Sequence, residues 1–400
     1  MSVATNQEFP FWEDFIAFCQ RLIQTPSVSG QEGAIAELIQ EEMKRLKYDE
    51  VWADPVGNVI GILKGNPDRP ALCFTGHMDT VPPGDEKKWE YPPFSGVIAD
   101  GYLHGRGAGD MKCAVASHVY LPAMLRHAGL KPDDIGDLYV IPVAQEEVGG
   151  LGSKYLDKNL LKAIDYAVNS EPTSNMICTG HRGRAEITVS IMGKAAHASR
   201  PWQGVNPFFD LARFLLDLNK LEMPGYRDLK STAVPTVLKT DTATSNVIPG
   251  QCILTIDWRN VPGESETQIM EKLNKILPKS GTAQFVGYDL TTYTGKTLPV
   301  MRKRAPFSTD ENHPAVKAIV AAVKYRLNQE PVVTWWEGAN DCGYFADAGI
   351  PIAGFGPSES KYSHTSRERI SLEMLSDAVR CLPVIVANLS QLEKRKRTEP

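Results

Sequence analysis

The sequence has no long apolar run and no large excess of charge of one sign, and both absences exclude classes of function. No uninterrupted apolar stretch approaches the length of a membrane-spanning helix, so we expect no membrane partner. The formal net charge is -5, from 43 basic and 48 acidic side chains, which leaves no polycationic surface to bind nucleic acid. The N-terminal residues also lack the basic start and apolar core of a signal peptide.

Paired cysteines and two common catalytic motifs are absent as well. The seven cysteines are scattered and never form a C-x-x-C pair, which is typical of reduced, mostly buried thiols in a cytoplasmic protein. No G-x-S-x-G occurs, which disfavours a serine hydrolase. The glycines of residues 105–109 are followed by Asp110, an acidic side chain where a phosphate would approach, which argues against a nucleotide site.

Two different patterns of strands and helices follow one another along the 400 residues, which are enough for two or three domains. In residues 1–181, apolar strands alternate with helices, including an apolar helix that continues to about residue 128. Residues 182–298 change to a β-α-β-β-α-β order, and the first pattern returns in residues 299–400. We therefore predict a largely parallel α/β sandwich catalytic domain, built from the two outer segments, with an inserted ferredoxin-like α+β domain.

The segment around which the chain is organised is an apolar strand that ends in His77 and Asp79, followed by a turn at residues 82–84. Side chains two positions apart leave the same face of an extended segment. A carboxylate that steers a metal-binding histidine is a usual arrangement around a metal. An isolated H-x-D pair would suit a solvated loop equally well, so the interpretation depends on the rest of the chain.

Further ligand-type side chains stand at other predicted strand ends and loops, which meet at the carboxyl edge of an open α/β sheet. They are Asp110, Glu146, Glu147, Glu171 and His364. Two histidines with several carboxylates suit zinc or a similar divalent ion. Three of these carboxylates, Asp110, Glu147 and Glu171, against two divalent cations leave about +1, which one hydroxide neutralises, as in hydrolytic sites whose metals lie roughly 3.5–4 Å apart. On an extended strand end the adjacent glutamates would point in opposite directions, so one can bind metal while the other takes a proton from water.

Each of these pieces has a simpler interpretation when taken alone, such as a helix N-cap for Asp110 or a solvated edge for the adjacent glutamates. In combination and in this order, the motifs resemble those of the co-catalytic zinc aminoacylases and carboxypeptidases. That family includes acetylornithine deacetylase, succinyl-diaminopimelate desuccinylase and carboxypeptidase G. The resemblance covers essentially the whole chain. Its matching segments are Gly76-His77-Met78-Asp79-Thr80-Val81, Gly105-Arg106-Gly107-Ala108-Gly109-Asp110-Met111-Lys112, Gln145-Glu146-Glu147, Ser170-Glu171-Pro172 and His364.

The resemblance implies a zinc-exopeptidase-like catalytic domain that holds two divalent metal ions, zinc in the first place, with cobalt or manganese as alternatives. It implies that Asp110 bridges the metals and is followed by a cis peptide bond. The two remaining ligands of one metal would be His77 and Glu171, and those of the other Glu147 and His364. By the same resemblance Glu146 is the general base and Asp79 orients His77.

The inserted segment, residues 182–298, resembles the lid and dimerisation domain of the same family, which implies a homodimer. Residues 193–199 match the segment whose histidine, here His197, reaches the partner subunit's site and supports the tetrahedral oxyanion. Judged from the residues alone, His197 would better suit a surface role. Asn246 and Arg259 lie in segments that hold the substrate's carboxylate, and Arg259 is the natural bidentate group.

These features predict a metal-dependent hydrolase that cleaves the amide bond of an N-acyl amino acid, like acetylornithine deacetylase, with a metal-bound water activated by Glu146. The substrate would be this small molecule or a short peptide. Gly338, expected beside it, lies in a loop that differs from the Gly-Thr-Ser-Asp of close relatives, so specificity stays open. The turn at residues 180–184 carries one arginine fewer before its glycine than the desuccinylase branch, which counts against a succinyl group.

Two alternatives stay open at this point. A dipeptidase or carboxypeptidase would use the same residues on a different substrate. A scaffold or binding protein that kept the fold belongs to another class, and it would require the loss of a ligand or of the base, of which none is lost.

Overall fold

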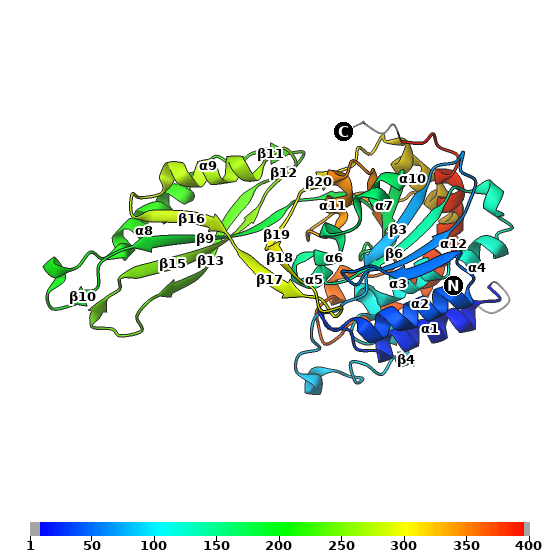
Figure 1. The fold of residues 1–400 in the computed structure, drawn as a ribbon, viewed down its shortest axis with the longest axis horizontal. Coiled ribbons are helices and arrows are strands. Elements are labelled where there is room, and N and C mark those ends of the chain that lie inside the picture. Colours follow the sequence, from blue (N-terminus) through cyan, green and yellow to red (C-terminus); the bar gives the residue numbers. More distant parts are fainter. Residues whose placement is uncertain (1–8, 396–400) are drawn as a thin grey trace.

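The computed structural model describes residues 9–395, which form a layered body and an elongated second unit that extends away from it (Figure 1). The body is built on a nine-stranded sheet of order β1-β2-β6-β3-β7-β22-β8-β20, with β21 paired to β8. The central neighbours β6, β3, β7 and β22 run parallel. The strands are β1 Glu50–Ala53, β2 Val59–Leu63, β3 Leu72–His77, β6 Leu138–Val143, β7 Tyr166–Asn169, β8 Ile177–His181, β20 Phe307–Ser308, β21 Val333–Trp336 and β22 Ile352–Phe355.

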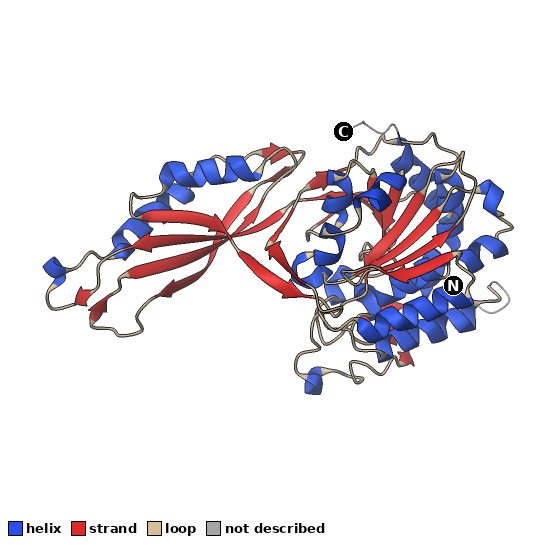
Figure 2. Ribbon diagram, in the orientation of Figure 1, coloured by secondary structure: helices blue, strands red, loops and turns tan. Residues whose placement is uncertain are grey.

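Helices cover both faces of this sheet, which explains why its central strands are buried along their whole length (Figure 2). In β3, Leu72 and Phe74 point into the larger core and Cys73 into the smaller one on the opposite face. The helices of the larger core are α1 Trp12–Gln24, α2 Gly33–Arg45, α3 Cys113–Val119, α4 Leu121–His127, α10 Pro314–Leu327 and α12 Leu372–Leu389. On the other side lie α5 Glu146–Gly149, α6 Leu151–Lys154, α7 Lys158–Ala163 and α11 Cys342–Asp347.

The second unit has the predicted β-α-β-β-α-β order and an antiparallel sheet of order β13-β15-β9-β16, which is a ferredoxin-like arrangement. Buried and half-buried residues alternate along β15, because its helices cover only one face of the sheet. Its elements are β9 Arg184–Met192, α8 Pro207–Leu218, β13 Thr232–Thr240, β15 Gln251–Arg259, α9 Glu266–Ile276 and β16 Gly281–Phe285. A short strand, β19 Lys303–Arg304, adds to β9. The domain boundaries proposed above stay a prediction.

The chain crosses between the two sheets at residues 182–183 and again at residues 305–306. The first crossing requires a glycine, because a Cβ on Gly183 would lie 2.2 Å from Asn260 Oδ1 and 2.7 Å from the backbone oxygen of Arg304. The N–H of Gly183 also donates to the backbone oxygen of Asn260 at 2.7 Å. The two crossings are therefore packed closely against each other.

The predicted continuous helix to about residue 128 is wrong, because the chain forms two helices that meet at Tyr120. Pro122 stands in the first turn of the second helix, where a missing N–H is tolerated, and this proline favours a new start over continuation. Within residues 9–395, no helix combines the length and apolar character that a bilayer crossing requires.

The remaining elements are short and mostly connect the sheets. The paired strands are β4 Ile98–Ala99, β5 Tyr102–His104 and β23 Arg369–Ser371 in one small sheet, β10 Ala196–His197 with β14 Val247–Ile248, β11 Gly225–Tyr226 with β12 Leu229–Lys230, and β17 Gly287–Thr291 with β18 Thr297–Met301. The short helical turns are η1 Glu86–Lys88, η2 Ala108–Lys112, η3 Pro132–Asp134, η4 Pro201–Gln203 and η5 Ser360–Tyr362.

Candidate metal centre

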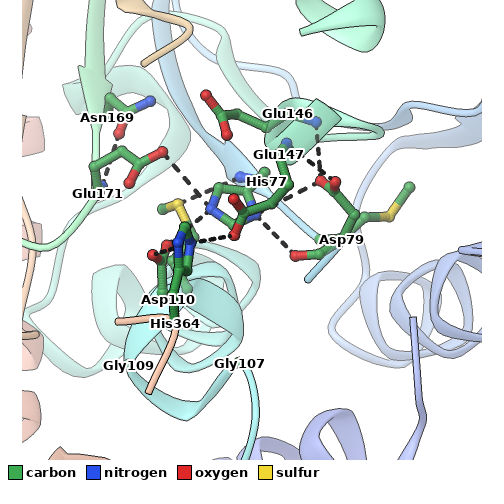
Figure 3. A network of polar contacts seen from close by, with 12 residues as sticks. His77, Asp79, Gly107, Gly109, Asp110, Glu146, Glu147, Asn169, Glu171 and His364 are labelled. Atoms are coloured by element: carbon green, nitrogen blue, oxygen red, sulfur yellow. Dashed lines mark hydrogen bonds and ion pairs between the residues drawn. The ribbon is translucent and has the colours of Figure 1, made fainter. Parts of the chain in front are cut away.

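The carboxyl ends of three neighbouring parallel strands bring most of the predicted site residues to one edge of the sheet. His77 is the last residue of β3 and pairs in register with Val143, the last residue of β6. The strand β7 flanks β3 on its other side and ends two residues before Glu171. Figure 3 shows these side chains converging with those of Asp110 and His364.

The carboxylate of Asp110 lies between two histidines. Its Oδ1 is 2.9 Å from Nε2 of His77, and its Oδ2 is 3.4 Å from Nε2 of His364. The same Nε2 of His364 lies 2.9 Å from Oε1 of Glu147, and Oε1 of Glu171 lies 3.7 Å from Nε2 of His77. Each oxygen of Asp110 thus faces a different histidine, and each histidine has a further carboxylate beside it.

Ligand-type atoms gather in two overlapping groups, and in each group they all lie within 4.8 Å of one another. One group is His77 with Glu146 and Glu171, and the other is His77 with Asp110 and Glu147. All of these side chains except that of Glu147 belong to buried residues, and Glu147 is half-buried. Imidazole nitrogens with several carboxylate oxygens form a donor set that fits two divalent cations.

Asp110 lies in the turn η2 that follows the glycine-rich segment, and its peptide bond to Met111 is cis, as the resemblance implied. A residue that sequence reasoning missed, Glu368, anchors this turn. Its Oε1 accepts hydrogen bonds from the backbone N–H groups of Gly107, Gly109 and Asp110 at 2.8, 3.3 and 3.0 Å. Its Oε2 pairs with the guanidinium of Arg106. The only signal in the sequence is an acidic residue four positions after His364.

Asp79 lies beside His77, but its carboxylate has a larger role than the predicted steering of that ring. Nδ1 of His77 lies 2.9 Å from the backbone oxygen of Asp79 and 3.6 Å from its carboxylate. The carboxylate instead accepts the N–H groups of Glu146 and Glu147 at 3.0 and 3.2 Å and the hydroxyl of Ser29 at 2.6 Å. Asp79 therefore holds in place the segment that carries the two glutamates.

The prediction that Glu146 and Glu147 stand on an extended strand end is wrong. Gln145 has a left-handed backbone with φ of 55°, and the single helical turn α5 begins directly after it. Successive side chains on a helix are about 100° apart, so the two glutamates still point in different directions. Glu147 faces His364, and Glu146 faces the guanidinium of Arg304.

Arg304 and Asp341 are further buried charges at the site that sequence reasoning missed. Nη2 of Arg304 lies 3.4 Å from Oε1 of Glu146 and also donates to its backbone oxygen. Nε of Arg304 lies 3.1 Å from Oδ1 of Asp341. Arg304 belongs to β19, so the second sheet contributes a charge beside the glutamates. In the sequence it is one member of an ordinary basic cluster at residues 302–304.

The electrostatics of the cluster show an excess of negative charge. Burial raises the pKa of the Glu146 carboxyl to about 8, although the charge of Arg304 opposes this. Burial likewise raises the pKa of Glu171 well above its usual value. Hydrogen bonds to Asp110 and Glu147 raise the pKa of His364 to about 10. Crowded, poorly solvated carboxylates favour bound cations, which supports the fit to divalent metals.

The sequence model of Peptidase family M20/M25/M40 matches residues 73–388, a range that contains the whole cluster. This chain belongs to that family. Membership makes it a metal-dependent hydrolase, as predicted, and the layered α/β body is the catalytic fold expected for it.

Relatives and solved structures agree with this membership. The chain is 29% identical to the uncharacterized protein YgeY of Escherichia coli (strain K12) over 364 residues, which cover 89% of each protein. It is 27% identical over 368 residues to a succinyl-diaminopimelate desuccinylase of Halorhodospira halophila (strain DSM 244 / SL1), covering 89% of this chain and 93% of the relative.

Two solved structures share the fold at lower identity. Aminopeptidase PepT from Bacillus cereus ATCC 10987 superimposes with a TM-score of 0.76 at 22% identity, covering 95% of this chain and 99% of the other. The Bacillus subtilis YXEP protein, a dinuclear metal-binding peptidase from the M20 family, gives a TM-score of 0.70 at 17% identity, covering 96% and 99%.

The predicted substrate-binding residues of this M20 family chain fall into two groups. Arg259 and Gly338 line a cavity of about 610 Å³ together with Glu146, Glu147 and His364. Arg259 is also paired with the carboxylate of Asp257, two residues before it, at 2.6 Å. Its guanidinium is therefore already held in a fixed orientation at the cavity wall.

His197 and Asn246 do not reach the metal centre of their own chain. His197 lies on β10 at the far end of the second unit, and β10 pairs with β14 (Figure 1). Asn246 precedes β14, and its backbone oxygen accepts the N–H of Ala198. The imidazole of His197 is exposed, and its Nδ1 accepts the N–H of Ser199 at 3.1 Å. A role in catalysis therefore requires a second subunit.

Proposed function

We propose that this metallohydrolase cleaves the amide bond of an N-acyl amino acid, using two zinc ions and Glu146 as general base. The single observation that carries the proposal is the position of the Asp110 carboxylate, which presents one oxygen to His77 and the other to His364. In the proposed assignment Asp110 bridges the metals. The other ligands are His77 and Glu171 for one metal and Glu147 and His364 for the other.

Two cations held there would polarise the scissile carbonyl and lower the pKa of water near them. The carboxylate of Glu146 accepts a proton from the attacking water and returns it to the leaving amine. Its burial and its anchored backbone support this role, since a general base must keep a fixed position. The turn of α5 aims Glu146 towards Arg304 and Glu147 towards His364, so the two carboxylates can have different roles.

The carboxylate of the substrate would be bound by Arg259, and the oxyanion would be stabilised by His197 from the second subunit of a homodimer. The position of Arg259 in the cavity wall and the distance of His197 from its own metal centre support these assignments. Asn246 precedes β14, the strand that pairs with β10, and its backbone oxygen accepts the N–H of Ala198. It would therefore enter the site together with His197.

The test is to load metal-free protein with zinc, cobalt or manganese and to measure amine release from N-acetyl, N-succinyl and N-aminoacyl amino acids. Metal-dependent turnover of the N-acyl compounds would establish a deacylase, and turnover of dipeptides alone would make the protein a dipeptidase. The variant Glu146→Gln should retain both metals and lose nearly all turnover. Normal turnover by a metal-loaded Glu146→Gln variant would reject the assigned base.

A further inference from the structure

The metal centre lies between two cavities of different character. One is the cavity of about 610 Å³ that contains Arg259, and the other, of about 680 Å³, lies on the side of β8 and β21. The two share part of their lining: Glu146, Glu147, Gly338, Ala339 and His364. A substrate whose scissile bond lies beside Glu146 would therefore place one half in each cavity.

The first cavity is cationic. Three arginines at the edge of the second sheet, Arg184, Arg259 and Arg302, share two carboxylates among the described residues, those of Glu186 and Asp257. Arg184 and Arg259 both pair with Asp257, at 3.0 and 2.6 Å. One positive charge is thus left over, and it suits the carboxylate of the amino-acid half of the substrate.

The second cavity has an aromatic wall. The pairing of β21 with β8 is irregular between Thr334 and Trp336, because β8 has one residue more than β21 over this stretch and Trp335 lies opposite the bulge. A Cβ on Gly180 would lie 2.7 Å from the ring of Trp335, and one on Gly354 would lie 2.1 Å from the ring of Trp336. Both indoles therefore rest on positions where the sheet carries no side chain.

The two glycines lie on the same face of the sheet. Gly354 pairs with Cys178 across the antiparallel β22 and β8, so these two residues share a face, and Gly180 is two positions further along β8. Both indole rings therefore cover the face that also carries Cys178 in the cavity wall. Met176 and Thr334 extend the same wall.

This aromatic side offers little to an anionic group. Among the described residues that line the second cavity, the one lysine or arginine is Lys361. Its side chain is 64% exposed and is already paired with Glu359 at 2.6 Å. A second carboxylate, as in a succinyl group, would therefore find no uncompensated cation on this side.

We infer that the acyl half of the substrate is aromatic or broadly apolar, and that Trp335, Trp336 and Met176 form its binding pocket. This inference rests on the proposed function and adds the chemical class of the acyl group. A benzoyl or hexanoyl group would cover the indole wall, whereas an acetyl group would leave most of it in contact with water.

The test measures kcat/KM for the N-benzoyl, N-hexanoyl, N-acetyl and N-succinyl derivatives of one amino acid with the zinc-loaded protein. We expect the benzoyl and hexanoyl compounds to exceed the acetyl and succinyl compounds by about tenfold or more, since each well-packed apolar group contributes at least that much discrimination. The variant Met176→Trp, which fills the pocket, should lower the benzoyl-to-acetyl ratio about tenfold. Trp335→Ala should lower the same ratio by removing part of the wall.

A matched control is Tyr325→Ala, which removes an aromatic ring that is 74% exposed on α10 and should leave the ratio unchanged. A wild-type preference for acetyl or succinyl over benzoyl would overturn the inference and leave the proposed function standing. An unchanged ratio in both pocket variants would also overturn it. Failure to hydrolyse any of the four compounds with two metals bound would reject the proposed function itself.

Discussion

The carboxylate of Glu368 accepts a hydrogen bond from the backbone N–H of Asp110 at 3.0 Å, across 258 residues of sequence. The same oxygen also accepts the N–H groups of Gly107 and Gly109, and the other oxygen pairs with Arg106. Glu368 is fully buried, so it fixes the backbone beneath the carboxylate that would bridge the metals. The metal centre therefore depends on a residue that need not touch a metal.

The first prediction concerns this anchor. Replacement of Glu368 by Gln keeps the size of the side chain and removes the charge that holds Arg106 and three N–H groups. We expect metal affinity to fall about 10- to 100-fold, as is usual when a group that positions a ligand is lost. The measurement is metal content after dialysis against graded chelator, together with the absorption spectrum of the cobalt form.

Glu330→Gln is the matched control, because Glu330 is an exposed glutamate paired only with Lys324 at the surface. It should bind metal like the wild type. Unchanged metal affinity in Glu368→Gln, with wild-type circular dichroism, would contradict a positioning role for Glu368.

The second prediction concerns Asp79, which accepts the backbone N–H groups of both Glu146 and Glu147. In Asp79→Asn one acceptor oxygen becomes an N–H donor, which cannot pair with a backbone N–H. We expect kcat to fall about 10- to 100-fold because the turn that carries the general base is released. Ser29→Ala, which removes one hydroxyl contact to the same carboxylate, should have a much smaller effect. Equal losses in the two variants would contradict this account.

Much of the fold and of the candidate site could be predicted from the sequence because the relevant patterns are local. The apolar strands that end at His77 and shortly before Glu171 run parallel to each other in the sheet. The carboxyl ends of parallel strands meet at one edge of the sheet. The positions of Glu368 and Arg304 could not be predicted, since their partners Asp110 and Glu146 are 258 and 158 residues away. Nothing in the spacing of these charges indicates that they meet.

Local backbone geometry was the other source of error. The helical turn at Glu146 depends on the left-handed backbone of Gln145, a conformation that a glutamine adopts only when its surroundings impose it. Here the side-chain amide of Gln145 donates to the backbone oxygen of Thr291, and the backbone N–H of Gln145 donates to the carboxylate of Glu32. Such tertiary contacts override the extended geometry that the sequence pattern favours.

The third prediction concerns stability in acid. Burial raises the pKa of Glu42, but hydrogen bonds from Arg45, Tyr120 and Arg21 outweigh it and hold the pKa below its usual value. A carboxyl with a lowered folded-state pKa stabilises the protein above its unfolded pKa of about 4.3 and loses this contribution as the pH falls through the folded value. Glu42→Gln should therefore be about 1–3 kcal/mol less stable at pH 7, with a smaller difference below about pH 4.

The measurement is the denaturant midpoint of both proteins between pH 3 and 8, and Glu41→Gln is the control. Glu41 is an exposed neighbour on the same helix α2, and its replacement should leave the midpoint unchanged at each pH. A difference between wild type and Glu42→Gln that stays constant from pH 7 to pH 3 would contradict a charged Glu42 as its cause.

The fourth prediction concerns His197, which lies at the far end of the second unit from the metal centre of its own chain. If a second subunit supplies this imidazole, His197→Ala should lower kcat by about 10²- to 10³-fold, as the loss of one oxyanion donor does elsewhere. It should leave metal content unchanged, because no metal ligand is touched. The sharper measurement mixes this variant with Glu146→Gln after subunit exchange.

In a two-fold symmetric dimer, half of the subunit pairs formed at random would be hybrids, and each hybrid would have one site with both Glu146 and His197 intact, restoring about a quarter of wild-type turnover. Arg213→Gln provides a control for subunit exchange, since its exposed side chain pairs only with Asp210 on the same helix. A mixture of Arg213→Gln with Glu146→Gln should show only the activity that the Arg213→Gln subunits contribute, with no gain from subunit exchange. Full activity of a monomer, or no recovery on mixing the two inactive variants, would place His197 outside the reaction.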